Sequence, residues 1–141
     1  MARFGRHVYG LGAIALGAIC LAFGDFHPGQ PVPKDFPERT TLAYIVALFM
    51  LLAGIAVEWR RTAAVATAAL AAYFGLIVVV LMNGAVLAKH YAEFGPYESI
   101  AIQLAIALGG VIAWANCAPI DAARAARIVR AARWVFGVCA L

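Results

Sequence analysis

Four long stretches without a charged residue constrain this chain more than any other feature. They are residues 8–24, 40–57, 62–88 and 99–120. A helix needs about 20 apolar residues to cross a hydrocarbon core of about 30 Å. In lipid the backbone N–H and C=O groups must pair within their own segment, so such spans are helical. The sequence therefore predicts an all-α membrane protein with a four-transmembrane-helix bundle.

Composition supports a membrane protein. Hydrophobic residues make up 65% of the chain and charged residues 13%, with a mean hydropathy of +0.90, whereas soluble domains carry about 25% charge. One alternative concerns residues 1–24. Arg3 and Arg6 before an apolar stretch resemble a signal peptide, with a small-residue cleavage site at Ala22-Phe23-Gly24. The length of the stretch favours a first membrane span.

The distribution of basic residues predicts the orientation. The N-terminus, the second loop and the tail hold most of them, namely Arg3, Arg6, Arg60, Arg61, Arg124, Arg127, Arg130 and Arg133. Cytoplasmic loops carry the excess of Lys and Arg. We therefore expect a multi-pass membrane protein with both termini on the cytoplasmic side. The net charge of +4 favours contact with anionic lipid at the inner face. The basic residues do not form the patch that is typical of nucleic-acid-binding proteins.

The first loop has an unusual sequence, "DFHPGQPVPKDFPERT". Its four prolines and its glycine exclude a regular helix over most of its length. Phe26, Val32 and Phe36 supply apolar anchors, so the loop is either a compact cap on the outer membrane face or a plain connector. In the first span, Gly10 and Gly17 predict close helix packing, either within the bundle or at a dimer face.

The chain divides into residues 1–118, the four-helix domain, and residues 119–141, a basic tail on the cytoplasmic side. Asp121 is a suitable N-cap, and the Ala and Arg residues after it are strong helix formers. The four tail arginines cover about half of a helix circumference. We therefore predict a short amphipathic helix over residues 121–133 that lies flat on the inner membrane surface. A solvated tail is the alternative.

The tail also repeats the start of the chain. When residues 128–141 are laid over residues 1–14, five positions agree: Arg3 with Arg130, Arg6 with Arg133, Val8 with Val135, Gly10 with Gly137, and Ala13 with Ala140. Internal symmetry of this kind is often weak in membrane proteins. The match arises either by chance or from a second unit. In the second case, residues 134–141 should continue into the bilayer and pack against a neighbouring helix.

Four residues at the outer ends of the first and third spans are candidates for a metal site: Asp25, His27, His90 and Glu93. His90 and Glu93 are three residues apart, so one helix face could hold both. Imidazole and carboxylate groups bind metals, but no motif such as HExxH is present, and ordinary interfacial polar residues are the alternative. The three cysteines form no CxxC pair. Asn83 interrupts the third span and is expected to face another helix.

Three segments together resemble the DoxX-like family of small bacterial membrane proteins: "GRHVYGLGAIALGAICLAFGDF", "QPVPKDFP" and "LAYIVALFMLLAGIAVEWRRTA". The resemblance covers about residues 4–118. It implies a four-helix inner-membrane bundle, and some members are subunits of thiosulfate–quinone oxidoreductases or of redox-stress complexes. His27 matches a histidine that relatives often have. Lys89-His90-Tyr91 stands where they have His-Leu-Pro. Some members run two units in tandem, which implies a truncated second unit at the C-terminus.

The sequence thus favours a non-enzymatic membrane subunit, redox-linked, that docks a protein partner or another copy of itself, or binds a quinone or lipid. Quinone is the cofactor that the resemblance implies. One alternative is a metal-binding or redox enzyme that acts at the outer face through Asp25, His27, His90 and Glu93. A second alternative is a small transporter, although few polar residues, such as Asn83 and Gln103, interrupt the spans.

Overall fold

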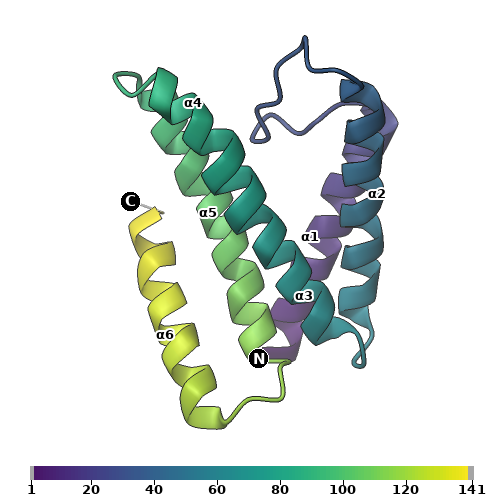
Figure 1. Cartoon of the computed structure of the whole chain (residues 1–141). Coiled ribbons are helices and arrows are strands. Elements are labelled where there is room, and N and C mark those ends of the chain that lie inside the picture. The colour runs from purple at the N-terminus through teal and green to yellow at the C-terminus, as the bar shows by residue number, and fades with distance from the viewer. Residues whose placement is uncertain (1, 140–141) are drawn as a thin grey trace.

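The computed structural model describes residues 2–139, and Met1, Ala140 and Leu141 lie outside the described part (Figure 1). One position of the internal match, Ala140, is therefore not described. In chain order the elements are α1 (Ala2–Phe23), α2 (Arg39–Glu58), α3 (Ala63–Ala72), η1 (Tyr73–Asn83), α4 (Gly84–Lys89), α5 (Phe94–Ala115) and α6 (Ala122–Cys139). All are helices, as predicted.

Four helical segments are long and apolar enough to cross a membrane: Phe4–Phe23, Arg39–Glu58, Ala63–Lys89 and Phe94–Ala115. The prediction of a four-helix membrane bundle is confirmed. The segments run alternately up and down (Figure 1). We call the end that holds the long loop after α1 the loop end, and the end where α1 and α6 begin the terminal end.

Small residues hold α1 against α2. A Cβ added at Gly17 would lie 2.7 Å from the backbone nitrogen of Leu51, and one added at Gly54 would lie 2.9 Å from the carbonyl oxygen of Gly10. Such residues let helix backbones approach closely in lipid, where dispersion forces drive association. Gly10 and Gly17 of the first span therefore pack within the chain. Beside this contact lies a core that includes Met50 and Phe74.

The third span contains a π-helix, η1, between two α-helical parts. Its i→i+5 hydrogen bonds make each turn wider than an α-helical turn. Tyr73, Val78 and Asn83 are all buried at intervals of five residues, which an α-helix would place about 140° apart around its axis. The wider turns of the π-helix bring these three side chains closer together around the axis than an α-helix would.

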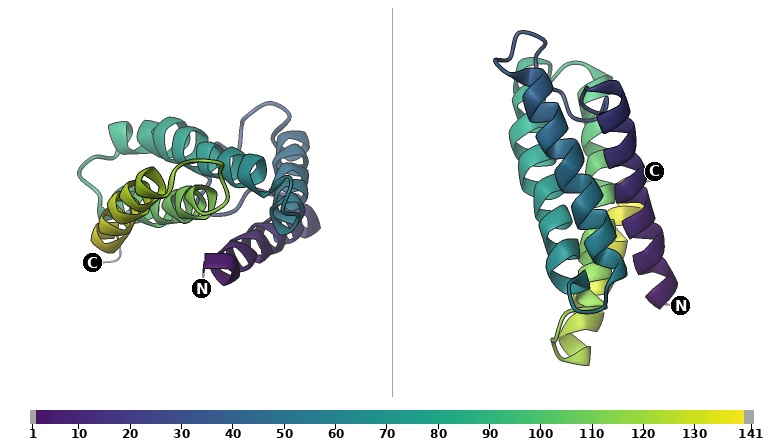
Figure 2. Two further views of the ribbon diagram at one scale, coloured as in Figure 1. Left: turned by 90° about the horizontal axis from the view of Figure 1, so that it is seen from below. Right: turned by 90° about the vertical axis from the view of Figure 1, so that its right-hand side faces the viewer.

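The C-terminal helix differs from its predicted position. Asp121 caps it as expected, because its Oδ1 accepts a hydrogen bond of 2.8 Å from the backbone N–H of Arg124. However, α6 runs back alongside α5 toward the loop end (Figure 1; the left view of Figure 2 looks along the bundle from the terminal end). Phe136 and Ile102 line one cavity, and Ala132 is buried. The prediction of a helix flat on the membrane surface was therefore wrong.

The reason for this placement lies in the chain itself. The connection between α5 and α6 is short, and short connections make neighbouring helices antiparallel. The alanine-rich face of α6 allows a close approach to α5, with Ala132 at the contact. The alternative expectation, that the tail continues beside a neighbouring helix, fits the structure.

Candidate functional site

The loop after α1 is compact, which matches one of the two predicted alternatives. Gly24 begins it with a φ of 62°, a left-handed conformation that glycine adopts without strain. A tight turn follows, in which the backbone N–H of Gln30 donates to the carbonyl of His27 at 2.7 Å. Phe26 and Gln30 are buried. The loop therefore folds into the loop end of the bundle.

Arg39, the first residue of α2, fastens this loop. Its guanidinium lies 2.5 Å from Asp25 Oδ1 and 5.6 Å from the centre of the Phe26 ring. Its Nε also donates to the carbonyl of Val32 at 3.4 Å. One arginine thus contacts three separate points of the loop, which keeps the loop in a single arrangement above α2.

Asn83 joins the loop to two helices. Its Nδ2 donates to the carbonyl of Gly29 at 3.1 Å and to that of Val78 at 2.9 Å. Its Oδ1 accepts a hydrogen bond of 2.7 Å from the Ser99 hydroxyl on α5. The expectation that Asn83 faces another helix is confirmed. These bonds satisfy a buried amide that would otherwise be costly in an apolar interior.

Two further amides are buried beside this network. Gln30 is 3% exposed and Gln103 is 2% exposed. Gly29 approaches α5 so closely that an added Cβ would overlap the Gln103 amide. Within the described residues, the Oε1 atoms of both glutamines are buried and make no hydrogen bond. Buried acceptors of this kind favour a polar group or a water molecule nearby.

A cavity of about 730 Å³ lies between the loop and the third span, and we call it the loop-end groove. Its walls are mostly apolar, and Tyr73, Lys89 and His90 are the lining residues with polar side-chain groups. A second cavity of about 340 Å³, more polar, includes Asn83, His90 and Glu93. Pro31, Val86 and His90 line both cavities. The site thus places a largely apolar groove next to a smaller, more polar cavity.

The four candidate metal ligands, Asp25, His27, His90 and Glu93, take part in three separate interactions. Asp25 pairs with Arg39, and His90 Nδ1 lies 2.9 Å from Glu93 Oε1. His27 Nδ1 accepts a hydrogen bond of 3.1 Å from the backbone N–H of Gly29. Across residues 2–139, no group of three or more His, Cys, Asp or Glu side chains has the arrangement of a metal site. The four candidates are not brought together as one ligand set.

Sequence reasoning missed an ionisable pair at the terminal end. His7 Nδ1 contacts Glu58 Oε2, and Arg6 lies 3.3 Å from the other ring nitrogen of His7. A signal was present in the sequence. His7 directly precedes the first charge-free run and Glu58 directly follows the second. Antiparallel spans place these two positions on the same side of a membrane.

Comparison with known proteins supplies no family for this chain. It matches no family model, no curated protein and no solved structure. The functional argument therefore depends on the geometry of the described residues.

Proposed function

We propose that the chain is a membrane-embedded binding subunit of the DoxX-like type, and that its loop-end groove binds an isoprenoid quinone. The observation that carries this proposal is a largely apolar groove beside a more polar cavity, with Pro31, Val86 and His90 lining both. A quinone has the matching form, with a polar ring at one end of an apolar tail. Ligand sites are commonly apolar cavities with a few placed polar groups.

The residues around the groove fit this class of ligand. The His90 ring and the Lys89 ammonium are hydrogen-bond donors in the lining of the groove, where quinone carbonyl oxygens would accept. Tyr73, Ile77 and Leu81 provide apolar contact for the tail. A bound quinone would supply two-electron redox chemistry. The chain itself would bind the ring, orient it through Lys89 and His90, and exclude water through the ordered loop.

The proposal includes an orientation. With the loop end on the periplasmic side of a bacterial inner membrane, the arginines of the terminal end would lie in the cytoplasm, as the distribution of basic residues predicts. A membrane-impermeant thiol reagent should then label a Lys34→Cys variant from the periplasm and a Thr62→Cys variant from the cytoplasm, because both positions are exposed. The reverse labelling pattern would contradict this orientation.

Binding of a short-chain benzoquinone, decylubiquinone, to the purified full chain tests the function. Ile77→Trp places a bulky side chain in the groove, and we expect binding to weaken by roughly tenfold or more. Leu76→Trp is the matched control, because Leu76 is 64% exposed and does not line the groove. Its affinity should stay within about twofold of the unsubstituted chain. Equal binding by the two variants would contradict a quinone site in the groove.

A further inference from the structure

A second pair of cavities lies between α1 and α6, beside α5. The larger has a volume of about 520 Å³ and apolar walls from α1, α5 and α6. The smaller, of about 410 Å³, continues toward the terminal end. Val8, Tyr9 and Gly109 line both cavities. We call the two together the α1–α6 crevice.

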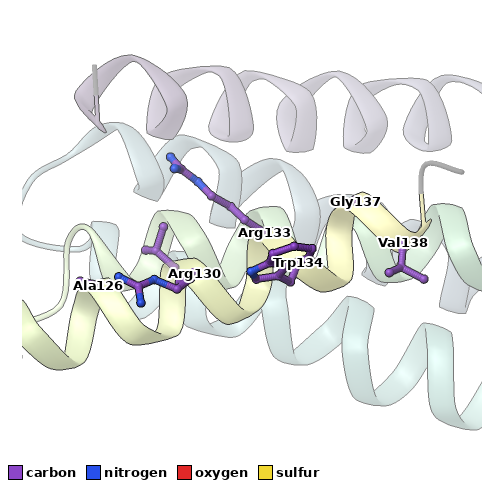
Figure 3. A pocket seen from close by; sticks show the side chains of 7 residues that line it. Ala126, Arg130, Arg133, Trp134, Gly137 and Val138 are labelled. Carbon is purple, nitrogen blue, oxygen red and sulfur yellow. The ribbon is translucent and has the colours of Figure 1, made fainter.

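The crevice has cationic groups at one end only. Arg6 from α1 and Arg133 from α6 line the smaller cavity, and no charged side chain lines the larger one. Figure 3 shows Arg133 reaching from α6 toward α1, while Arg130 and Trp134 point away from it. These two arginines are also equivalent positions in the internal match. The repeat thus provides one arginine on each side of the crevice.

Two polar atoms at this end have no partner in the described residues. Arg6 Nε and the Tyr9 hydroxyl oxygen are buried and make no hydrogen bond there. A Cβ added at Gly110 would lie 2.5 Å from that hydroxyl, so Tyr9 is held tightly against α5. Buried donors without acceptors favour an acceptor-rich group, and arginine pairs with phosphate through two parallel hydrogen bonds.

An apolar crevice between membrane helices is filled by acyl chains, because the bilayer core contains no water to fill it. The occupant must therefore combine an acyl chain with an anionic, acceptor-rich head. We propose that the α1–α6 crevice binds one anionic phospholipid. Its phosphate lies between Arg6 and Arg133, which line the smaller cavity, and an acyl chain lies in the larger cavity. This site is independent of the loop-end groove.

Titration of the detergent-solubilised full chain with phosphatidylglycerol, followed by native mass spectrometry, tests the proposal. We expect one phosphatidylglycerol molecule to bind. Phosphatidylcholine with the same acyl chains should bind at least about tenfold more weakly. Inorganic phosphate should not displace the lipid, because it lacks the acyl chain. Equal binding of the two lipids would overturn the proposal, and displacement by phosphate would assign the site to a free anion instead.

Two matched pairs of variants locate the site. Arg133→Gln should weaken phosphatidylglycerol binding by about tenfold, whereas Arg130→Gln, one turn earlier on α6 and outside the lining of the crevice, should change it by less than about twofold. Gly12→Leu fills the larger cavity without touching an arginine and should also weaken binding. Ala15→Leu, on the same helix but outside the crevice, should not. All four variants must keep the helical circular dichroism of the unsubstituted chain.

Several outcomes would overturn this assignment. Equal losses from Arg133→Gln and Arg130→Gln would mean that α6 attracts anionic lipid only through its overall charge. Unchanged binding by Gly12→Leu would mean that no acyl chain enters the larger cavity. A mass of twice the chain that appears only without lipid would assign the crevice to a second copy of the chain.

Discussion

α1 and α6 share a matching sequence, at the start of α1 and over residues 128–139 of α6, yet they have different surroundings. Both start at the terminal end and run toward the loop end beside α5 (Figures 1 and 2). In α1, Gly10 lies against Gly54 and Val57 of α2. In α6, the equivalent residue is Gly137, and an added Cβ there would have no atom within 4 Å. The same local pattern thus forms a helix in both places, and packing follows from the neighbour.

The comparison separates two roles of small residues in membrane helices. Glycine in α1 permits an interhelical approach that no larger residue allows. Glycine in α6 permits nothing of the kind, because its face is open. The contact of α6 with α5 instead involves Ala132, the buried residue of that helix. A small residue in the sequence therefore indicates a possible contact, and only a partner at the right distance makes use of it.

The largest expected effect tests how firmly α1 is seated. A Gly17→Ala substitution places a Cβ 2.7 Å from Leu51 N and 2.8 Å from the Ala47 carbonyl oxygen. Both are backbone atoms, so α1 and α2 must separate, and we expect a loss of about 3 kcal/mol in the free energy of unfolding. Thermal unfolding followed by circular dichroism in detergent measures it.

Gly12→Ala is the control for that experiment. Gly12 lies on the same helix, and an added Cβ there has open space around it. The substitution should leave the unfolding temperature unchanged or raise it. If the two variants unfold alike, the close approach of α1 and α2 is not a major source of stability.

The equivalent glycines give the most direct comparison and a smaller effect. Gly10→Ala directs a Cβ to within 2.5 Å of Glu58 Oε1, at the end of a flexible side chain, and 3.2 Å from the Gly54 carbonyl oxygen. We expect a net loss of about 1 kcal/mol. Gly137→Ala should instead gain about 0.5 kcal/mol, because alanine is the better helix former. Chemical unfolding of both variants checks the opposite signs, and a shared sign would remove the distinction between α1 and α6.

The smallest expected change in stability concerns His7, which follows Arg6 on α1, and Trp134, which follows Arg133 on α6. His7 on α1 pairs with Glu58, whereas its counterpart on α6, Trp134, is 74% exposed. Because both members of the pair are partly exposed, His7→Phe should cost only about 0.5 kcal/mol. Trp134→Phe should change stability by less than this. A double-mutant cycle of His7→Phe with Glu58→Gln measures the coupling, and a coupling energy of zero would show that the pair contributes nothing.

Much of the fold followed from the charge-free runs alone. The charge-free run at residues 40–57 matches both ends of α2 to within two residues, and the run at residues 8–24 matches the end of α1. The agreement arises because charged residues avoid the hydrocarbon core. The cap at Asp121 and the burial of Asn83 were also predictable, because each depends on one residue and its local hydrogen-bonding needs.

Features that depend on a partner helix were not predictable. The arginines of α6 suggested a surface helix because four of them cover half of its circumference, and nothing in the tail showed that α5 would accept Ala132. The π-helix also lacked a local signal. Tyr73, Val78 and Asn83 are buried at intervals of five residues. An amphipathic α-helix buries residues at intervals of three and four, so this spacing was not expected from the sequence.

The candidate site was predicted only in part. Sequence placed His27, His90 and Glu93 near one end of the bundle, which is correct for the His90–Glu93 pair. It did not anticipate that the loop would bury Gln30 against the helices, because that burial requires Gly29 to pass directly beside Gln103. Contacts between segments so far apart in the sequence depend on how their surfaces fit together in the folded chain, and residue types alone do not predict that fit.

The unequal fastening of the bundle has a mechanical consequence. α2 and α3 are joined by a short turn at the terminal end, and Asn83 ties the loop to η1 and α5 at the loop end. Across the remaining side, α1 meets α5 mainly through Tyr9, which lies against Gly109 and Gly110. Thermal breathing of the bundle must therefore widen this side at the terminal end. The packing of Tyr9 against Gly109 and Gly110 therefore contributes to the cross-sectional area of the protein in that leaflet, and hence to its response to the lateral pressure of the bilayer.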